Sequence, residues 1–344
     1  MTSSPGFPTV SLRQSVGIDI GSKEFFSCLG QEQFDRSVKL NSPVSFANTD
    51  LGFPALIQWV KDQGAQPKDC QFVMEATGVY YESLALWLVN HGYEVSVLLP
   101  NTVVAFARSL NQKTKNDPVD SRTLARMGCE RNLDSWRPPL SQYKALKQLT
   151  RHRQKLTKQR AMAKNQLHAA KKEAPASEVV IESYESIITF FTGKIKEIDQ
   201  QIKKLLEAHP QMKKDYNYVL SIPSIGPVVA GVLLAETQGF HAFRNHKQLV
   251  SYAGYDVIQR QSGSSINFQE RISKKGNIHI RRILFFPSIN VSRYIPDFNR
   301  MYQRINEKNP KTKMKGSVAL QRKLLVLAYH LVKNQQEYDS EKHK

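Results

Sequence analysis

The sequence contains few cysteines, and they are far apart. Cys28, Cys70 and Cys129 are the only three in 344 residues, and no two of them form a C-x-x-C pair. This spacing argues against a disulfide framework and against a thiolate zinc site. We therefore expect the chain to work in a reducing compartment, the cytoplasm.

Segments that could enter a membrane are also lacking. One long uncharged stretch, residues 216–235, is interrupted by Pro223, Gly226 and Pro227, and the remaining apolar helix is too short to cross about 30 Å of hydrocarbon. Residues 1–14 are rich in Ser and Pro and have no apolar core, so we expect a flexible tail rather than a signal peptide. The sequence predicts no membrane partner.

Acidic residues are scarce relative to basic ones. The chain has 49 Lys and Arg against 30 Asp and Glu, a formal net charge of +19. Such an excess favours a polyanionic partner, of which nucleic acid is the first candidate. Anionic membrane surfaces attract the same composition, so charge alone leaves both partners open.

Residues 15–135 alternate between β-prone and amphipathic segments. We expect strands at 16–20, 25–29 and 37–40, a helix near 51–60, a strand at 71–74, a helix at 81–89 and a strand at 93–98. Three successive strands followed by alternating helices and strands predict a mixed α/β sheet, in the order that the ribonuclease H architecture has.

A Pro-containing segment at 136–140 predicts a linker, and two helical segments follow it within 141–210, separated near Pro175. Apolar residues recur in both at spacings of three and four. This pattern is typical of an antiparallel helical hairpin or of an intermolecular coiled coil, and the sequence leaves both open.

The first of these helices carries many cations and almost no acids. Ordinary solvated helices mix the two signs because oppositely charged residues four apart stabilise each other. The excess favours contact with a phosphate backbone. The residues that we expect to make this contact are Arg151, Arg153, Lys155, Lys158, Arg160 and Lys164.

Residues 211–334 are predicted to be mainly helical, with an apolar closing helix at 318–332, and residues 335–344 form a polar tail. The turn at 222–227 resembles a helix-hairpin-helix, whose backbone amides can hold a phosphate. A corner between two packed helices explains the same residues, so both interpretations stay open.

Two predicted strands contain a carboxylate near their ends. Asp19 occupies an inward position of the apolar strand at 16–20, and Glu75 follows the strand at 71–74. An unpaired buried charge costs several kcal/mol, so each carboxylate is expected to need a partner such as a metal ion. A solvated strand end is the alternative for either residue alone.

Asp117 and Asp120 lie at the start of another predicted helix, with Asp117 expected at the N-cap and Pro118 at the first helical position. Their spacing puts both carboxylates on one face of the first turn. With Asp19 and Glu75 they form an ordered set of four hard oxygen donors, the ligands that Mg²⁺ or Mn²⁺ prefers. Two such ions can stabilise the attacking and leaving oxygens of a phosphoryl transfer.

The segment Gly17-Ile18-Asp19-Ile20-Gly21-Ser22 is also similar to the first phosphate loop of sugar-kinase and actin-like ATPases. Those proteins need a second Asp-Gly phosphate hairpin later in the chain. The sequence shows none, which argues against this interpretation.

Several motifs in a fixed order extend over residues 16–332. They are Gly17-Ile18-Asp19, Glu75-Ala76-Thr77-Gly78, Asn116-Asp117-Pro118-Val119-Asp120, Ile222-Pro223-Ser224-Ile225-Gly226-Pro227, Tyr252-Ala253-Gly254, Ser262-Gly263 and Ile272-Ser273-Lys274-Lys275-Gly276-Asn277. In this order they resemble the DEDD-type transposases of the bridge-RNA-guided insertion sequences, a family that includes the Piv-type DNA invertases.

The resemblance implies a RuvC-like domain at 15–135, with Asp19, Glu75, Asp117 and Asp120 as catalytic metal ligands. It further implies coiled-coil helices at 141–210 for assembly into a dimer or tetramer, and a C-terminal transposase domain at 211–334. DNA as the substrate and a structured guide RNA follow from the resemblance as well.

The family's nucleophilic serine corresponds by motif position to Ser262, which a metal or base would have to activate. The family usually shows a second glycine after Ser262-Gly263, but Ser264 and Ser265 stand there, so the register of the nucleophile stays open. Likewise, Ser224 replaces the usual glycine of the Pro-x-Ile-Gly turn.

A basic segment follows the proposed serine, and its cations are expected to position the scissile phosphate. These residues are Lys274, Lys275, Arg281 and Arg282. The sequence thus predicts a metal-dependent DNA recombinase that uses a serine nucleophile. A Piv-like invertase, a Holliday-junction-type metal nuclease and a non-catalytic nucleic-acid-binding protein are the alternatives.

Overall fold

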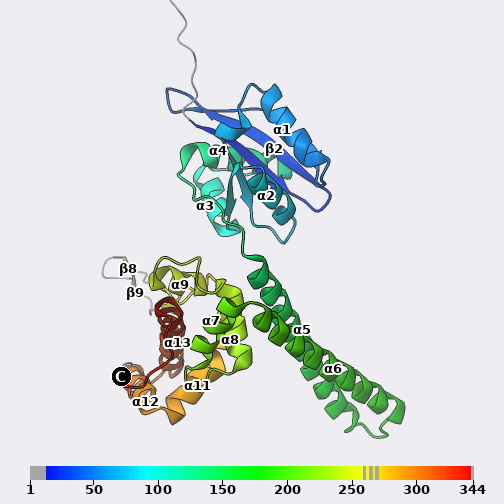
Figure 1. Ribbon diagram of the computed structural model, residues 1–344, viewed down its shortest axis with the longest axis vertical. Helices are drawn as coiled ribbons and strands as arrows, with labels where there is room; N and C mark the ends of the chain where they lie inside the picture. Colours follow the sequence, from blue (N-terminus) through cyan, green and yellow to red (C-terminus); the bar gives the residue numbers. More distant parts are fainter. Residues whose placement is uncertain (1–12, 259–260, 263–265, 268–270, 342–344) are drawn as a thin grey trace, which may run out of the picture. The chain divides into compact units, whose positions relative to one another are not determined.

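The computed structural model describes residues 13–258, 261–262, 266–267 and 271–341. The chain separates into two compact units, Met1–Pro138 and Pro139–Lys344, and the boundary falls in the predicted linker (Figure 1). The residues that the sequence divides between a coiled-coil domain and a C-terminal domain therefore lie in one unit. Each unit is described by itself.

A mixed sheet forms the centre of the N-terminal unit, as predicted. Its strands are β1 (Gln14–Ile20), β2 (Glu24–Glu32), β3 (Val38–Leu40), β4 (Val44–Ala47), β5 (Cys70–Glu75) and β6 (Glu94–Leu98). The order is β3-β2-β1-β5-β6, with β4 also paired to β2. Strands β1 to β3 are antiparallel neighbours, whereas β5 runs parallel to β1 and β6 parallel to β5. Strand β4 was not predicted.

Helices cover both faces of this sheet. They are α1 (Gly52–Asp62), α2 (Tyr81–Asn90), α3 (Pro100–Ser109) and α4 (Asp117–Glu130), with a single 3₁₀ turn at Pro67–Asp69. On one face, buried residues of β1 and β5 such as Ile18 and Phe72 pack with Leu56 of α1 and Leu84 of α2. On the other face, Val73 of β5 packs with residues of α3 and α4. Helix α3 was not predicted.

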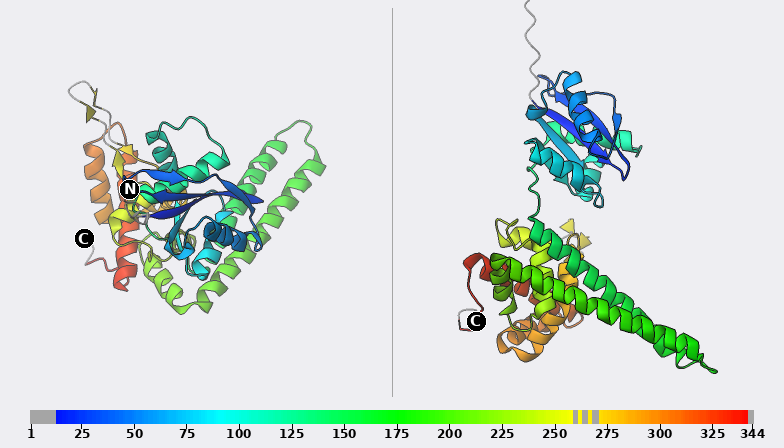
Figure 2. Two further views of the ribbon diagram at one scale, coloured as in Figure 1. Left: turned by 90° about the horizontal axis from the view of Figure 1, so that it is seen from above. Right: turned by 45° about the vertical axis from the view of Figure 1, so that its right-hand side comes forward.

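The C-terminal unit begins with a long helical hairpin. Helices α5 (Ser141–Ala170) and α6 (Glu178–Ala208) run side by side in opposite directions within the same chain (Figures 1 and 2). Leu156 of α5 and Ile195 of α6 are 7% and 5% exposed, so each helix buries part of its apolar repeat. Of the two arrangements that the periodicity allowed, the hairpin is the one observed.

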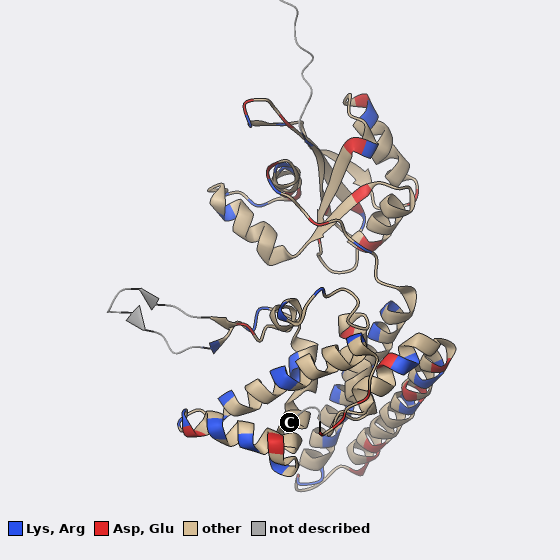
Figure 3. Ribbon diagram, turned by 60° about the vertical axis from the view of Figure 1, so that its left-hand side comes forward, with Lys and Arg blue, Asp and Glu red and all other residues tan. Residues whose placement is uncertain are grey.

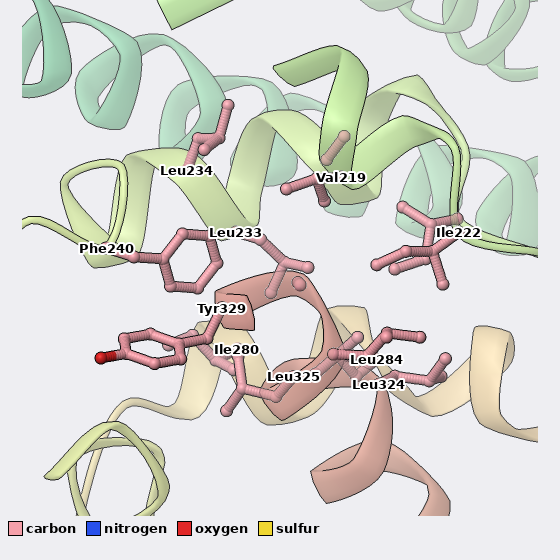
Figure 4. Packing of buried hydrophobic residues seen from close by; sticks show 14 of the residues in the cluster. Val219, Ile222, Leu233, Leu234, Phe240, Ile280, Leu284, Leu324, Leu325 and Tyr329 are labelled. Carbon is pink, nitrogen blue, oxygen red and sulfur yellow. The ribbon is translucent and has the colours of Figure 1, made fainter. Parts of the chain in front are cut away.

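The remaining helices of this unit surround the apolar helix predicted near the C-terminus. They are α7 (Pro210–Leu220), α8 (Pro227–Thr237), α9 (His246–Ala253), α10 (Ile278–Ile283), α11 (Phe285–Tyr294) and α12 (Pro296–Glu307), and the apolar helix itself is α13 (Met314–Asn334). Figure 4 shows Leu325 and Tyr329 of α13 facing Leu233 of α8 and the neighbouring Phe240. The Phe240 and Tyr329 ring centroids are 6.2 Å apart.

Two short strand pairs complete the unit. Strand β7 (Val257–Ile258) pairs with β10 (Arg271–Ile272), and β8 (Gln261–Ser262) pairs with β9 (Ile266–Asn267). Among the helices that the structure describes, none is long and apolar enough to cross a membrane.

Candidate metal centre and nucleic-acid interface

Helix α4 lies directly on strand β1 because β1 carries a glycine at the contact. A Cβ on Gly17 would lie 2.1 Å from the backbone nitrogen of Ala125 and 2.2 Å from the carbonyl oxygen of Ser121. No other side chain fits at that distance from backbone atoms. The glycine of the Gly17-Ile18-Asp19 motif therefore brings the first half of α4 within reach of the end of β1.

The register of the sheet brings two of the predicted carboxylates together. Gly17 and Ile18 of β1 pair in parallel with Val73 and Met74 of β5, so Asp19 and Glu75 follow as the next residues in register. Side chains alternate between the two faces of a strand. Because Gly17 and Val73 face α4, the side chains of Asp19 and Glu75 belong to the same face.

The start of α4 supplies the other two carboxylates. Asp117 and Asp120 both lie in its first turn, where the positive end of the helix dipole favours acids. The expected N-cap was wrong by one residue: Asn116 is the cap, and its side-chain oxygen accepts the Val119 N–H at 3.0 Å. With Asn116 as the cap, the Asp117 carboxylate is not needed for that role.

The four carboxylates act on one another through their charges. Burial, together with the charges of Asp117, Asp120 and Glu75, raises the pKa of Asp19 to about 7, against a lowering by Lys115. The pKa of Asp120 is also raised, first by burial and then by Glu75 and Asp117. A cluster in which the charged form is disfavoured gains from a cation.

The donor set fits a hard divalent cation, since all four residues offer carboxylate oxygens. Glu75 is oriented locally, because the Thr77 hydroxyl donates to its Oε1 at 2.9 Å. Among the described residues, however, no three His, Cys, Asp or Glu side chains are gathered closely enough to hold a metal ion. The side chains would have to converge for an ion to bind.

Among the described residues, the predicted nucleic-acid contacts divide into arginines that bind within the chain and other cations for which no such partner is seen. Arg151 pairs with Glu236 through both nitrogens, at 2.7 and 2.9 Å, and Arg153 pairs with Asp199 of α6 at 2.5 Å. Arg281 donates to the carbonyl oxygens of Ala253 and Lys274. The acids that α5 lacks are thus supplied in part by other helices.

Arg160 also has an internal contact, a hydrogen bond of 3.4 Å from its guanidinium to the hydroxyl of Thr192 on α6. The other predicted contact residues have exposed side chains with no acidic partner among the described residues. They are Lys155, Lys158, Lys164, Lys274, Lys275 and Arg282. Figure 3 shows Lys and Arg, in blue, spaced along the helices of this unit.

The sequence did not single out Glu236, which lies at the centre of the C-terminal unit. Its side chain is 0% exposed and accepts hydrogen bonds from Arg151 of α5 and from the Asn277 amide at 2.7 Å. Burial alone would raise the pKa of Glu236, but the hydrogen bonds from Arg151 and Asn277 and the nearby positive charges lower it. A single acid at the end of the apolar helix α8 was the signal in the sequence.

The Ser273-to-Asn277 motif is held in place by this network. The side-chain oxygen of Asn277 caps α10 by accepting the His279 and Ile280 N–H groups at 2.9 and 3.3 Å, while its amide donates to Glu236. Gly276 lies so close to the next segment that a Cβ would be 2.4 Å from the carbonyl oxygen of Tyr252. The motif therefore links α8, α9 and α10.

The predicted nucleophile lies at the edge of the described residues. Ser262 ends strand β8, where its partner is Ile266 of β9, and Ser264 and Ser265 lie outside the described residues.

In the 222–227 turn, Ile222 and Ile225 are buried, and Ser224 has a φ of +66°. That left-handed conformation favours glycine, the residue that Ser224 replaces.

Comparisons with known proteins find similarity along most of the chain. Residues 16–173 match a family described as "Transposase", and residues 216–303 match the "Transposase IS116/IS110/IS902 family". The pilin gene-inverting proteins of Moraxella bovis and Moraxella lacunata are each 31% identical over 331 residues, which cover 95% of this chain and 98% of theirs.

Two further proteins are more distant. The transposase for insertion sequence element IS1328 of Yersinia enterocolitica is 23% identical over 236 residues, 62% of this chain and 69% of that protein. Among solved structures, T. thermophilus RuvC in complex with a Holliday junction matches 34% of this chain and 90% of its own length, with 10% identity and a TM-score of 0.24. The full-length similarity shows that the chain belongs to the IS110-type transposases, together with the pilin gene-inverting proteins, and is a DNA recombinase.

Proposed function

We propose that the chain cleaves and exchanges DNA strands with the help of Mg²⁺ or Mn²⁺, held in a RuvC-like N-terminal unit by Asp19, Glu75, Asp117 and Asp120. The observation that carries this proposal is the packing of α4 on Gly17, which brings the acids of α4 to the strand ends that carry Asp19 and Glu75. The mutual effect of these acids on their pKa values supports it. When bound, such ions stabilise the attacking and leaving oxygens of a phosphoryl transfer.

The nucleophile in this proposal is the hydroxyl of Ser262. Attack by its oxygen on a DNA phosphate forms a phosphoserine bond, transfers the hydroxyl proton to a base or solvent, and releases one sugar hydroxyl. Attack on the phosphoserine by a hydroxyl of another strand then restores the phosphodiester and the serine. The number of phosphate ester bonds is conserved, so the exchange needs no external energy source.

A plasmid strand-exchange assay with purified full-length protein tests the metal site. Asp19→Asn and Asp120→Asn should abolish exchange while DNA binding survives, and Asp50→Asn is the matched control, an exposed acid of the same unit outside the cluster. Chelation should stop the wild-type reaction, and Mg²⁺ or Mn²⁺ should restore it. Full activity of either cluster variant would contradict the proposal.

The serine is tested by the covalent intermediate. We expect a protein–DNA adduct on a denaturing gel with wild-type protein and none with Ser262→Ala. An adduct that persists in Ser262→Ala would transfer the assignment to Ser264 or Ser265. Hydrolysed DNA ends without any adduct would instead indicate a metal nuclease of the junction-resolving type.

We further propose that the active protein is a dimer or tetramer that carries a structured guide RNA. Helix α6 supports the first part, since it leaves Val179, Ile187 and Phe190 exposed by 77%, 38% and 58% although α5 covers its other face. A Phe190→Ser variant should shift the protein to a smaller species in light scattering.

Sequencing the RNA that copurifies with the chain tests the guide RNA, and protein that is fully active without RNA would contradict this part of the proposal.

A further inference from the structure

The C-terminal unit contains a cavity of about 1170 Å³ that the proposed chemistry does not use. Residues of α9, β7, β10, α12 and α13 line it, together with Tyr255 and residues of the segment between α12 and α13. Pockets for small molecules usually have roughly 300–1,000 Å³. This cavity is larger, which favours one unit of a longer polymer over a free small molecule.

The floor of the cavity is apolar. Met301 of α12 and Val318 and Val326 of α13 are half-buried residues that line it. Tyr255 lies beneath with only 1% exposure, and its position is fixed because its hydroxyl donates to Oε1 of Gln321 at 2.9 Å. This lining suits a flat, uncharged group that is removed from water when it binds.

The charged lining residues are all basic. They are Arg271, Lys274, Lys315, Arg322 and Lys323. Within the described part of the chain, the side chains of Arg271, Lys274 and Arg322 are exposed and have no acidic partner. Lys315 donates to the neutral Asn309 at 2.7 Å, and Lys323 lies 5.0 Å from the ring centre of Phe298. This concentration of positive charge favours an anionic ligand.

We propose that this cavity holds an unpaired nucleotide of a DNA or RNA strand, with the base against the apolar floor and the adjoining phosphates at the basic residues. Proteins that hold single strands combine these two elements, a cationic groove for the backbone and an apolar or aromatic surface for the base. Removing a base from its stack costs a few kcal/mol, which a preformed pocket offsets. The proposal rests on the proposed function only in that the substrate is a nucleic acid.

The test follows base insertion directly. Single-stranded DNA and RNA oligonucleotides with one 2-aminopurine are titrated with full-length protein in EDTA, so that no strand is cut. Fluorescence of the analogue should rise on binding to wild-type protein because the base leaves its stacked neighbours. The variant Ala319→Trp fills the cavity from α13, and we expect it to abolish the rise and to weaken binding by roughly tenfold.

Two controls separate insertion from general attraction. An abasic site in place of 2-aminopurine should weaken wild-type binding by about the same factor. It should leave Ala319→Trp binding unchanged, because the abasic site and the substitution remove the same contact. Arg271→Gln with Arg322→Gln should weaken binding far more than Lys311→Gln with Lys313→Gln, which removes the same charge at exposed positions outside the cavity. Thermal unfolding checks that each variant is folded.

Equal fluorescence and affinity for wild type and the folded Ala319→Trp variant would overturn the proposal, as would equal effects of the two double variants. A change in self-association without a change in nucleotide binding would overturn it in favour of a protein segment as the occupant. DNA and RNA are distinguished by which oligonucleotide gives the signal. Loss of strand exchange in the carboxylate variants is independent of these results, so either proposal can fail without the other.

Discussion

Two carboxylates of this chain, the half-buried Asp19 in one unit and the buried Glu236 in the other, have pKa values shifted in opposite directions. Asp19 is half-buried near three other acids, and its pKa is raised to about 7. Glu236 is buried beside Arg151 and Asn277, and its pKa is lowered. Burial acts in the same sense on both, so the difference comes from the neighbours.

The comparison separates an acid whose charge is compensated within the chain from one whose neighbours are mostly other acids. Every oxygen of the Glu236 carboxylate has a donor within the chain, so its charge is already compensated. Within the described residues, the charges that act on Asp19 are three acids and one lysine, so a bound cation would supply the compensation that is lacking. A buried acid without an internal partner is the one that is suited to hold a metal ion.

The largest expected effect concerns the contact between Gly17 and α4, which brings the acids near one another. Gly17→Ala puts a methyl group onto the backbone of α4, so we expect a loss of about 3 kcal/mol or more in the free energy of unfolding. All three tryptophans lie in the N-terminal unit, so their fluorescence in a urea titration reports on this unit.

Gly193→Ala is the matched control for that substitution. A Cβ at Gly193 of α6 meets nothing within 4 Å, so we expect a gain of about 0.5–1 kcal/mol from the better helix propensity. Because α6 belongs to the other unit, far-ultraviolet circular dichroism is the measurement. Equal stabilities of wild type and Gly17→Ala would contradict the close packing of α4 on β1.

The second prediction concerns Glu236, the acid whose charge is compensated within the chain. Glu236→Gln leaves Arg151 without its partner and should cost about 2–3 kcal/mol, less than for a fully buried pair because Arg151 is 41% exposed. Asp199→Asn breaks the exposed pair with Arg153 and should cost less than about 1 kcal/mol. Circular dichroism in urea measures both, and equal costs would mean that burial of Glu236 is immaterial.

The pH dependence of this difference has a defined sign. Because the folded-state pKa of Glu236 is below the ordinary value of 4.5, its ionised form stabilises the fold above that pH. The contribution is lost as the pH falls through the folded-state pKa. The stability difference between wild type and Glu236→Gln should therefore be constant near neutral pH and shrink below about pH 4.5. A difference that grows on acidification would contradict this account.

The third prediction concerns the uncompensated acid. Without a metal ion, Asp19→Asn removes a half-buried charge from among like charges, so it should stabilise the N-terminal unit at pH 8, by about 1 kcal/mol after allowance for solvent screening. Tryptophan fluorescence in urea and EDTA provides the measurement. Destabilisation would mean that the ionised Asp19 already has partners within the chain.

The smallest expected effect lies in the turn between α7 and α8. Ser224 adopts a left-handed conformation with φ of +66°, so Ser224→Gly should stabilise the C-terminal unit by about 0.5–1 kcal/mol. Thermal unfolding followed by circular dichroism is sensitive enough to detect it. A loss of stability would show that the Ser224 hydroxyl has a role that its exposed position does not reveal.

The sheet of the N-terminal unit could be predicted because its inner strands, β1, β2 and β5, are rich in buried apolar residues. Helix α3 was missed, since its few buried residues, Val103 and Phe106, give only a weak repeat. The cap of α4 was misassigned by one residue because Asn116 and Asp117 are both good caps. Local preferences cannot choose between neighbours of equal propensity.

The candidate site was predictable as a set of residues but not as a geometry. Asp19 and Glu75 stand out as acids at the ends of apolar strands, whereas the importance of Gly17 depends on which helix packs on it. Arg151 was grouped with the exposed lysines of α5 because its partner, Glu236, lies 85 residues away in the sequence. Contacts between distant segments decide which cations stay available for a nucleic acid.

Binding of Mn²⁺ to the full-length protein, measured by isothermal titration calorimetry at pH 8, tests the carboxylate cluster most directly. We expect binding to wild type and to Asp50→Asn, and none to Asp19→Asn or Asp120→Asn. Unchanged Mn²⁺ binding in both cluster variants would show that the acids brought together by Gly17 are not the metal site.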